Sequence, residues 1–134
     1  MAQIIIYTNN NGGVSVCVPT GELAIEIVLV KDCPPGAIIV DDATLPQIDN
    51  DFFGAWELNG STISVNLDKA KTITKTRLRA EREPLLQAQD VLFQRALESN
   101  SDTNAIVIEK QRLRDITSLA DSATTLEGLR AIKV

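Results

Sequence analysis

Few residues in this sequence have side chains suited to catalysis. Histidine, the commonest general base and zinc ligand, does not occur among the 134 residues. The two cysteines, Cys17 and Cys33, are too few for a structural zinc site, and no glycine-rich phosphate loop, serine-nucleophile elbow or metalloprotease motif is present. We therefore predict that the chain is not an enzyme and uses no cofactor or metal ion.

Carboxylate pairs are the remaining candidates for metal binding. Asp41 and Asp42 are adjacent, and Asp49 and Asp51 flank an asparagine. Either pair could contact a divalent cation, but an EF-hand loop needs a longer, spaced set of ligands with a distal glutamate. Helix capping and turn formation explain these side chains better.

A cluster of bases lies between residues 69 and 82. It contains six lysines and arginines against one acid, a composition that suits phosphate contacts. However, the whole chain has a net charge of −5, and no aromatic residue interleaves these bases for stacking. A solvated helix face, or one docked on the acidic N-terminal half, explains the cluster better than nucleic acid binding does.

Charge divides the chain into two halves. Residues 1–66 hold eight acids and one lysine, whereas residues 67–134 hold ten acids and twelve bases. This difference predicts a domain boundary near residue 66. No apolar run approaches the roughly 20 residues of a membrane span, and the first residues lack the features of a signal peptide, so we expect a protein made in a cytoplasm.

The first half reads as a small α+β module. Two β-branched runs, at residues 3–8 and 14–18, flank an Asn-Gly turn and predict a β-hairpin. Cys17 alternates with valines in the second run, which favours its being a small buried apolar residue. A disulfide bond between Cys17 and Cys33 is the alternative. Residues 22–32 are predicted to form a helix, with Thr20 as a candidate N-cap. Because many of these residues are β-branched, a strand is the alternative.

Further elements complete this module. Residues 37–40 read as a short strand, residues 51–56 as one helical turn, and residues 57–65 as a second hairpin. On the helix at 22–32, three apolar residues share one side. They are Leu23, Ile27 and Val30. Trp56 and Phe53 are expected to fill the small core together with Phe52.

The second half changes to helical periodicity. Residues 67–100 are predicted to be one helix, capped by Asn66 or Asp68, with leucines repeating every seven residues. These are Leu78, Leu85 and Leu92. Pro84 inside this run predicts a kink or a break. A polar turn leads to a second helix ending near residue 119, and Thr124 or Thr125 caps a last short helix at 126–132.

The predicted fold is therefore an α+β module followed by a long antiparallel helical hairpin, with domains at 1–66 and 67–134. On the second helix, Ile106, Leu113 and Ala120 lie seven residues apart. The heptads leave open whether each stripe meets its own hairpin or another copy of the chain. Leu85 is expected to be a buried folding anchor.

Three segments of the chain resemble small proteins encoded beside tail and tail-fibre genes of tailed bacteriophages. They are residues 5–20 (IIYTNNNGGVSVCVPT), residues 52–60 (FFGAWELNG) with 65–71 (VNLDKAK), and residues 79–86 (RAEREPLL) with 110–117 (KQRLRDIT). The last segment is also similar to phage tail-assembly chaperones. The resemblance covers most of the chain and transfers no catalytic residue.

The resemblance implies a non-enzymatic protein located in the virion tail, which binds tail or tail-fibre subunits as a structural or adaptor protein. It leaves a non-virion assembly chaperone as the alternative. From the residues, we expect the partner to contact the basic face and the exposed side of the hairpin. The candidates are Arg77, Arg79, Arg82, Phe93 and Arg95. Packing within the hairpin explains Phe93 better than partner contact does.

Overall fold

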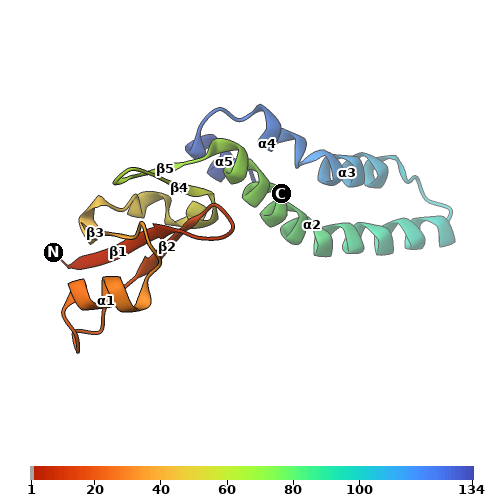
Figure 1. The fold of residues 1–134 in the computed structure, drawn as a ribbon. Helices are drawn as coiled ribbons and strands as arrows, with labels where there is room; N and C mark the ends of the chain where they lie inside the picture. The colour runs from red at the N-terminus through yellow and green to blue at the C-terminus, as the bar shows by residue number, and fades with distance from the viewer. Residues whose placement is uncertain (1) are drawn as a thin grey trace. The chain divides into compact units, whose positions relative to one another are not determined.

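The computed structural model describes residues 2–134 and divides into two compact units, Met1–Ala70 and Lys71–Val134. The first unit contains all the strands of the described residues, and the second is helical. The division falls inside the longest helix (Figure 1). The predicted α+β class is confirmed.

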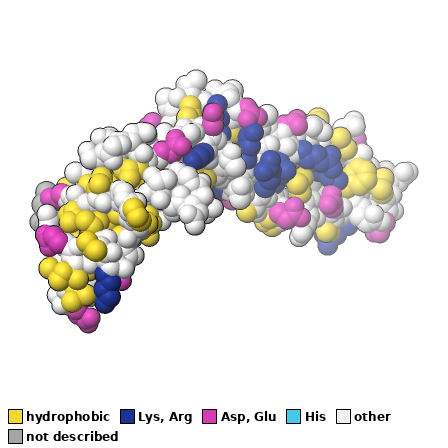
Figure 2. Space-filling view, viewed as in Figure 1, with side chains coloured by type: hydrophobic (Ala, Val, Ile, Leu, Met, Phe, Trp, Pro, Cys, Tyr) yellow, Lys and Arg dark blue, Asp and Glu magenta, His cyan; other side chains and the backbone are white. Residues whose placement is uncertain are grey.

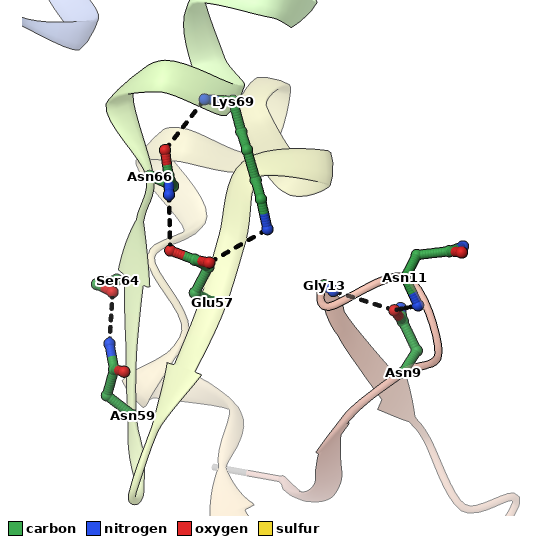
Figure 3. Close-up of polar contacts among 8 residues, drawn as sticks. All are labelled: Asn9, Asn11, Gly13, Glu57, Asn59, Ser64, Asn66 and Lys69. Atoms are coloured by element: carbon green, nitrogen blue, oxygen red, sulfur yellow. Dashed lines mark hydrogen bonds and ion pairs between the residues drawn. The ribbon is translucent and has the colours of Figure 1, made fainter.

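A three-stranded antiparallel sheet has the order β2-β1-β3. Its strands are β1 Gln3–Thr8, β2 Val14–Cys17 and β3 Ile38–Asp41. The predicted first hairpin is confirmed, since β1 pairs with β2. Its turn is closed by Asn9, whose Oδ1 accepts hydrogen bonds from the backbone N–H groups of Asn11 and Gly13, each at 3.0 Å (Figure 3). This Asx geometry explains why asparagine precedes the glycines.

A second hairpin, β4 Trp56–Asn59 and β5 Thr62–Val65, forms a separate two-stranded sheet and confirms the second predicted turn. Gly60 adopts φ 64°, the left-handed conformation that glycine tolerates. The core of this unit is a cluster of four buried residues surrounded by half-buried aliphatic ones. The four are Ile4, Ile6, Val14 and Trp56.

The aromatic residues before β4 are not placed as predicted. They lie in 3₁₀ helix, η2 Gln47–Ala55, which follows the short η1 Asp42–Thr44. Trp56 is buried and its indole N–H donates to the Asp49 carbonyl at 3.2 Å, and Phe52 is buried too. Phe53 is 41% exposed, so its expected role as a core anchor is wrong. Neighbouring side chains on this short helix point in different directions, and the sequence alone did not show which phenylalanine faces inward.

The helix expected at residues 22–32 is shorter, α1 Ile25–Asp32. Its N-cap position is Ala24, without a side-chain cap, so Thr20 does not start the helix. Val28 is the buried residue of α1. The three apolar residues expected on one side of this helix are exposed. These are Leu23, Ile27 and Val30.

The second half begins with α2 Leu67–Glu98, which is continuous through Pro84. The predicted break is therefore wrong. Proline removes one backbone donor, but Pro84 and Ala80, whose carbonyl would have accepted that hydrogen bond, are both exposed, and water can hydrate the carbonyl there. Asn66 caps the helix as one of the two predicted candidates, with its Oδ1 accepting from the Lys69 N–H at 3.1 Å.

Three shorter helices follow: α3 Asn104–Asp115, α4 Ser118–Ser122 and α5 Leu126–Ala131. The second predicted helix thus ends at residue 115, and a turn separates it from α4. Thr125 caps α5 as predicted, because its Oγ1 accepts from the Gly128 N–H at 3.0 Å. α3 runs beside α2 in the opposite direction and forms the predicted hairpin (Figure 1).

Candidate protein-interaction surface

Metal and thiol chemistry have little support among residues 2–134. These residues contain no group of three or more acidic or cysteine side chains that could hold a metal ion. Cys17 and Cys33 are half-buried free thiols. Burial raises the pKa of the Cys33 thiol, and a hydrogen bond with Cys17 raises it further. A raised pKa means that less of the Cys33 side chain is present as the reactive thiolate.

A polar network joins β4 to the first turn of α2 (Figure 3). The Asn66 side-chain amide donates to Glu57 Oε1 at 2.9 Å, and Lys69 Nζ donates to Glu57 Oε2 at 3.1 Å. The hydrogen bond from Asn66, followed by that from Lys69, holds the pKa of Glu57 below its ordinary value. Every polar group of this network has a structural partner, so it fixes the start of α2.

Bases of the cluster at residues 69–82 donate hydrogen bonds to the C-terminal ends of later helices. Lys71 Nζ donates to the Asp121 carbonyl in the last turn of α4, at 3.1 Å. Arg77 Nη2 donates to the Leu129 and Ile132 carbonyls at the end of α5, at 3.3 and 3.1 Å. The last carbonyls of a helix lack partners within it and carry the negative end of its dipole, so cations stabilise them.

Arg82 does the same for α3. Its Nη1 donates to the Arg114 carbonyl at 2.8 Å and to the Leu113 carbonyl at 3.3 Å. Three cations of α2 thus bind the C-terminal ends of three later helices. The sequence showed a basic cluster, but it did not show these partners, which lie 31 to 55 residues further along the chain.

Other bases of the cluster are paired as well. Lys69 binds Glu57, Lys75 binds Asp121, and Arg77 also binds Glu81 in the next turn. Arg79 is exposed. Most of the positive charge in this segment is therefore already opposed by carboxylates or carbonyls. This leaves little of the cluster for phosphate contacts.

Three of the five predicted partner-binding residues make contacts with other parts of the same chain. Arg77 and Arg82 bind helix ends, and Phe93 is half-buried beneath Lys110, whose Nζ lies 5.1 Å from the ring centroid. Lys110 also pairs with Asp90 at 2.6 Å, which fixes it over the ring. The side chains of Arg79 and Arg95 are exposed. These five residues therefore do not form one surface.

Aliphatic side chains are exposed on both helices of the hairpin, at positions other than the five predicted ones. On α2, Leu85 is 41% exposed and Leu92 is 44% exposed, so Leu85 is not the buried anchor that we expected. On α3, Val107 and Ile108, here called the α3 pair, are 49% and 71% exposed. Figure 2 shows hydrophobic side chains reaching the surface at the end of the hairpin, among acidic and basic ones. Where exposed aliphatic groups are contiguous, they can mark protein-binding surfaces.

The three heptad leucines of α2 differ in exposure, and the drift of a seven-residue repeat on a straight helix accounts for only part of the difference. Seven residues fall about 20° short of two full turns, so successive heptad positions rotate around the helix. Leu78 is fully buried, whereas Leu85 and Leu92 are progressively more exposed. The seven-residue repeat was visible in the sequence, but a drift of about 20° per repeat does not account for the step from 0% exposure at Leu78 to 41% at Leu85, so the later segments decide which leucines are covered.

Searches against known proteins do not identify relatives. No protein-family model, no curated protein and no solved structure matches this chain. Within residues 2–134, no helix combines the length and apolar character needed to cross a membrane.

Proposed function

We propose that this chain is a non-enzymatic structural or adaptor protein of a bacteriophage tail, which binds tail or tail-fibre subunits in the virion. The class of partner comes from the sequence resemblance to proteins encoded beside tail and tail-fibre genes. The observation that carries a binding role is the set of exposed aliphatic side chains on the hairpin, above all Val107 and Ile108.

The α3 pair is the proposed contact for the tail or fibre subunit. Both residues lie in the middle of a twelve-residue helix, whose position is fixed by Arg82 at its C-terminal end and by Lys110 beside Phe93. A rigid helix that presents aliphatic side chains loses little conformational freedom on binding. Burying the exposed parts of these two side chains against a partner would contribute about 1–2 kcal/mol each.

An assembly chaperone outside the virion is the alternative, because residues 79–86 and 110–117 are also similar to tail-assembly chaperones. Both functions require a complex with a tail or fibre subunit. They differ in whether the protein stays in the finished particle.

The test is affinity capture of a tagged chain from infected cells, with mass spectrometric identification of the captured proteins. We expect a tail or tail-fibre subunit of the same phage with the wild-type chain. Ile108→Asp should lower that capture at least tenfold, since it places a charge in the proposed contact. The matched control is Val30→Asp on α1, where an aliphatic side chain is 84% exposed outside the hairpin.

Capture of no tail or fibre subunit by the wild-type chain would contradict the proposal. Equal capture by the wild-type chain and Ile108→Asp would show that the α3 pair is not the contact. Circular dichroism of each variant should match the wild type, because both positions are exposed.

A further inference from the structure

One side of α2 carries a short row of residues with a glutamate at one end and an arginine at the other. We call Glu81, Leu85, Ala88, Leu92 and Arg95 the α2 stripe. Their spacing of four, three, four and three residues places them along one side of the helix. Leu85, Ala88, Leu92 and Arg95 are exposed and Glu81 is half-buried, so the side chains are accessible in the single chain.

The α2 stripe does not face α3. The contacts to α3 come from Arg82, Asp90 and Phe93. At about 100° per residue, these three residues lie roughly 100° to 180° around α2 from the centre of the stripe, so the stripe is on another side of the helix. In a four-helix bundle each helix packs against two neighbours, on two different sides. The hairpin therefore fills one of the two packing directions of α2 and leaves the other with leucines at its centre.

The charges at the two ends of the stripe complement those of the same stripe in a second copy of this chain. Glu81 lies seven residues before Ala88, and Arg95 lies seven residues after it. If two copies of α2 cross in antiparallel orientation at Ala88, Glu81 of each copy meets Arg95 of the other. In a parallel pair the same residues would meet their own kind and repel each other. The small side chain of Ala88 permits close approach at the crossing, with Leu85 and Leu92 on either side.

Glu81 can take part although it also binds Arg77 of its own helix at 2.8 Å. A carboxylate offers about four lone-pair directions, so it accepts from a second guanidinium as well. The 38% exposure of its side chain leaves room for that contact.

We propose that the α2 stripe binds the same stripe of a second copy of this chain, forming an antiparallel two-fold dimer in which two hairpins make a four-helix bundle. This inference goes beyond the proposed function, because it concerns the purified chain alone and a different face of the hairpin from the α3 pair.

The first test is the mass of the purified full chain by sedimentation equilibrium at about 100 µM, a concentration suited to small interfaces. We expect twice the 14.6 kDa chain mass. Leu92→Asp should give the mass of one chain, and the control Leu97→Asp, at a residue outside the stripe that is 55% exposed, should leave the dimer intact. A wild-type chain that sediments as a monomer would overturn the proposal.

Charge exchange tests the orientation. Arg95→Glu alone and Glu81→Arg alone should each weaken the dimer at least fivefold, since each places like charges opposite one another. The double variant Glu81→Arg with Arg95→Glu should recover most of the affinity. No recovery in the double variant would contradict the antiparallel pairing.

A cysteine at the crossing point tests the geometry and does not depend on affinity. In a chain with Cys17 and Cys33 changed to Ser, Ala88→Cys should form a disulfide-linked dimer under mild oxidation, because the two-fold axis brings the Cβ atoms within disulfide reach. Arg79→Cys, on another side of α2, should stay largely unlinked. Equal cross-linking at both positions would show random collision and would refute the proposed crossing.

Discussion

The N-terminal unit and the helical unit each bury some aliphatic residues and expose others, but they differ in the polar contacts that join their elements. In the N-terminal unit, strand residues and Trp56 turn inward to form one core between two small sheets. In the hairpin, Leu85, Leu92 and Ile108 stay at the surface, and charged side chains hold the helix ends together. Burial of Trp56 and the strand residues stabilises the first unit, whereas in the second unit hydrogen bonds from Arg77 and Arg82 to helix ends add to the burial of aliphatic side chains.

This difference bears on function. A residue that is buried in its own chain has no further partner to bind, whereas the exposed aliphatic groups of the hairpin can be buried only by another protein. The arginines that fasten the helix ends allow the hairpin to hold its form while these groups remain outside. Substitutions in each unit test these differences.

Trp56→Ala should lower the free energy of unfolding by about 3–5 kcal/mol, because it removes the largest buried side chain of the N-terminal core. Urea unfolding of the purified chain, followed by far-ultraviolet circular dichroism, measures the change. Leu92→Ala in the hairpin serves as the comparison and should cost less than about 1 kcal/mol, because its side chain is already 44% exposed. Similar losses for the two variants would remove the distinction between the units.

Arg82→Met should destabilise the hairpin by about 1.5–3 kcal/mol, since the Leu113 and Arg114 carbonyls lose a charged donor. The same urea experiment applies. The control Arg79→Met replaces an exposed arginine and should change the free energy of unfolding by no more than about 0.5 kcal/mol. Equal changes in the free energy of unfolding for the two variants would show that the helix-end contacts do not stabilise the hairpin.

Asn66→Ala should cost about 1 kcal/mol, because the Lys69 N–H in the first turn of α2 loses its cap. Asn66→Asp retains the capping oxygen but places a second carboxylate beside Glu57, so it should recover only part of the loss. Thermal unfolding of the three proteins ranks them. Full stability of Asn66→Ala would mean that this cap is dispensable.

Glu57→Gln should have the smallest effect, and that effect should depend on pH. Hydrogen bonds from Asn66 and then from Lys69 lower the pKa of Glu57 in the folded chain. A carboxylate with a lowered pKa contributes stability that is fully present above its unfolded pKa and is lost as the pH falls through the folded value. The melting temperature of the wild type should therefore exceed that of Glu57→Gln at neutral pH and converge with it in acid. A difference that stayed constant into acid would contradict this role of the charge.

Local signals in the sequence predicted most of the fold. The asparagine and glycines at residues 9–13 fix a hairpin turn through their own backbone preferences, and Thr125 caps the helix that directly follows it. These interactions connect residues within a few positions of each other. They can therefore be inferred without knowing the tertiary structure.

Contacts between distant residues account for what the sequence did not predict. Whether Phe52 or Phe53 faces the core depends on how the 3₁₀ segment meets the sheets, and Arg77 reaches carbonyls more than fifty residues away. The candidate surface was missed for the same reason. The heptad leucines are compatible with a seam inside the hairpin or outside it, and only the path of α3 decides which of them stay exposed.

The most direct test of a tail role is quantitative mass spectrometry of gradient-purified phage particles. We predict that the chain is present at a fixed ratio to a tail or tail-fibre subunit, and that the ratio is unchanged by a further round of purification. Its absence from particles whose other tail proteins are all detected would contradict a structural or adaptor role in the virion.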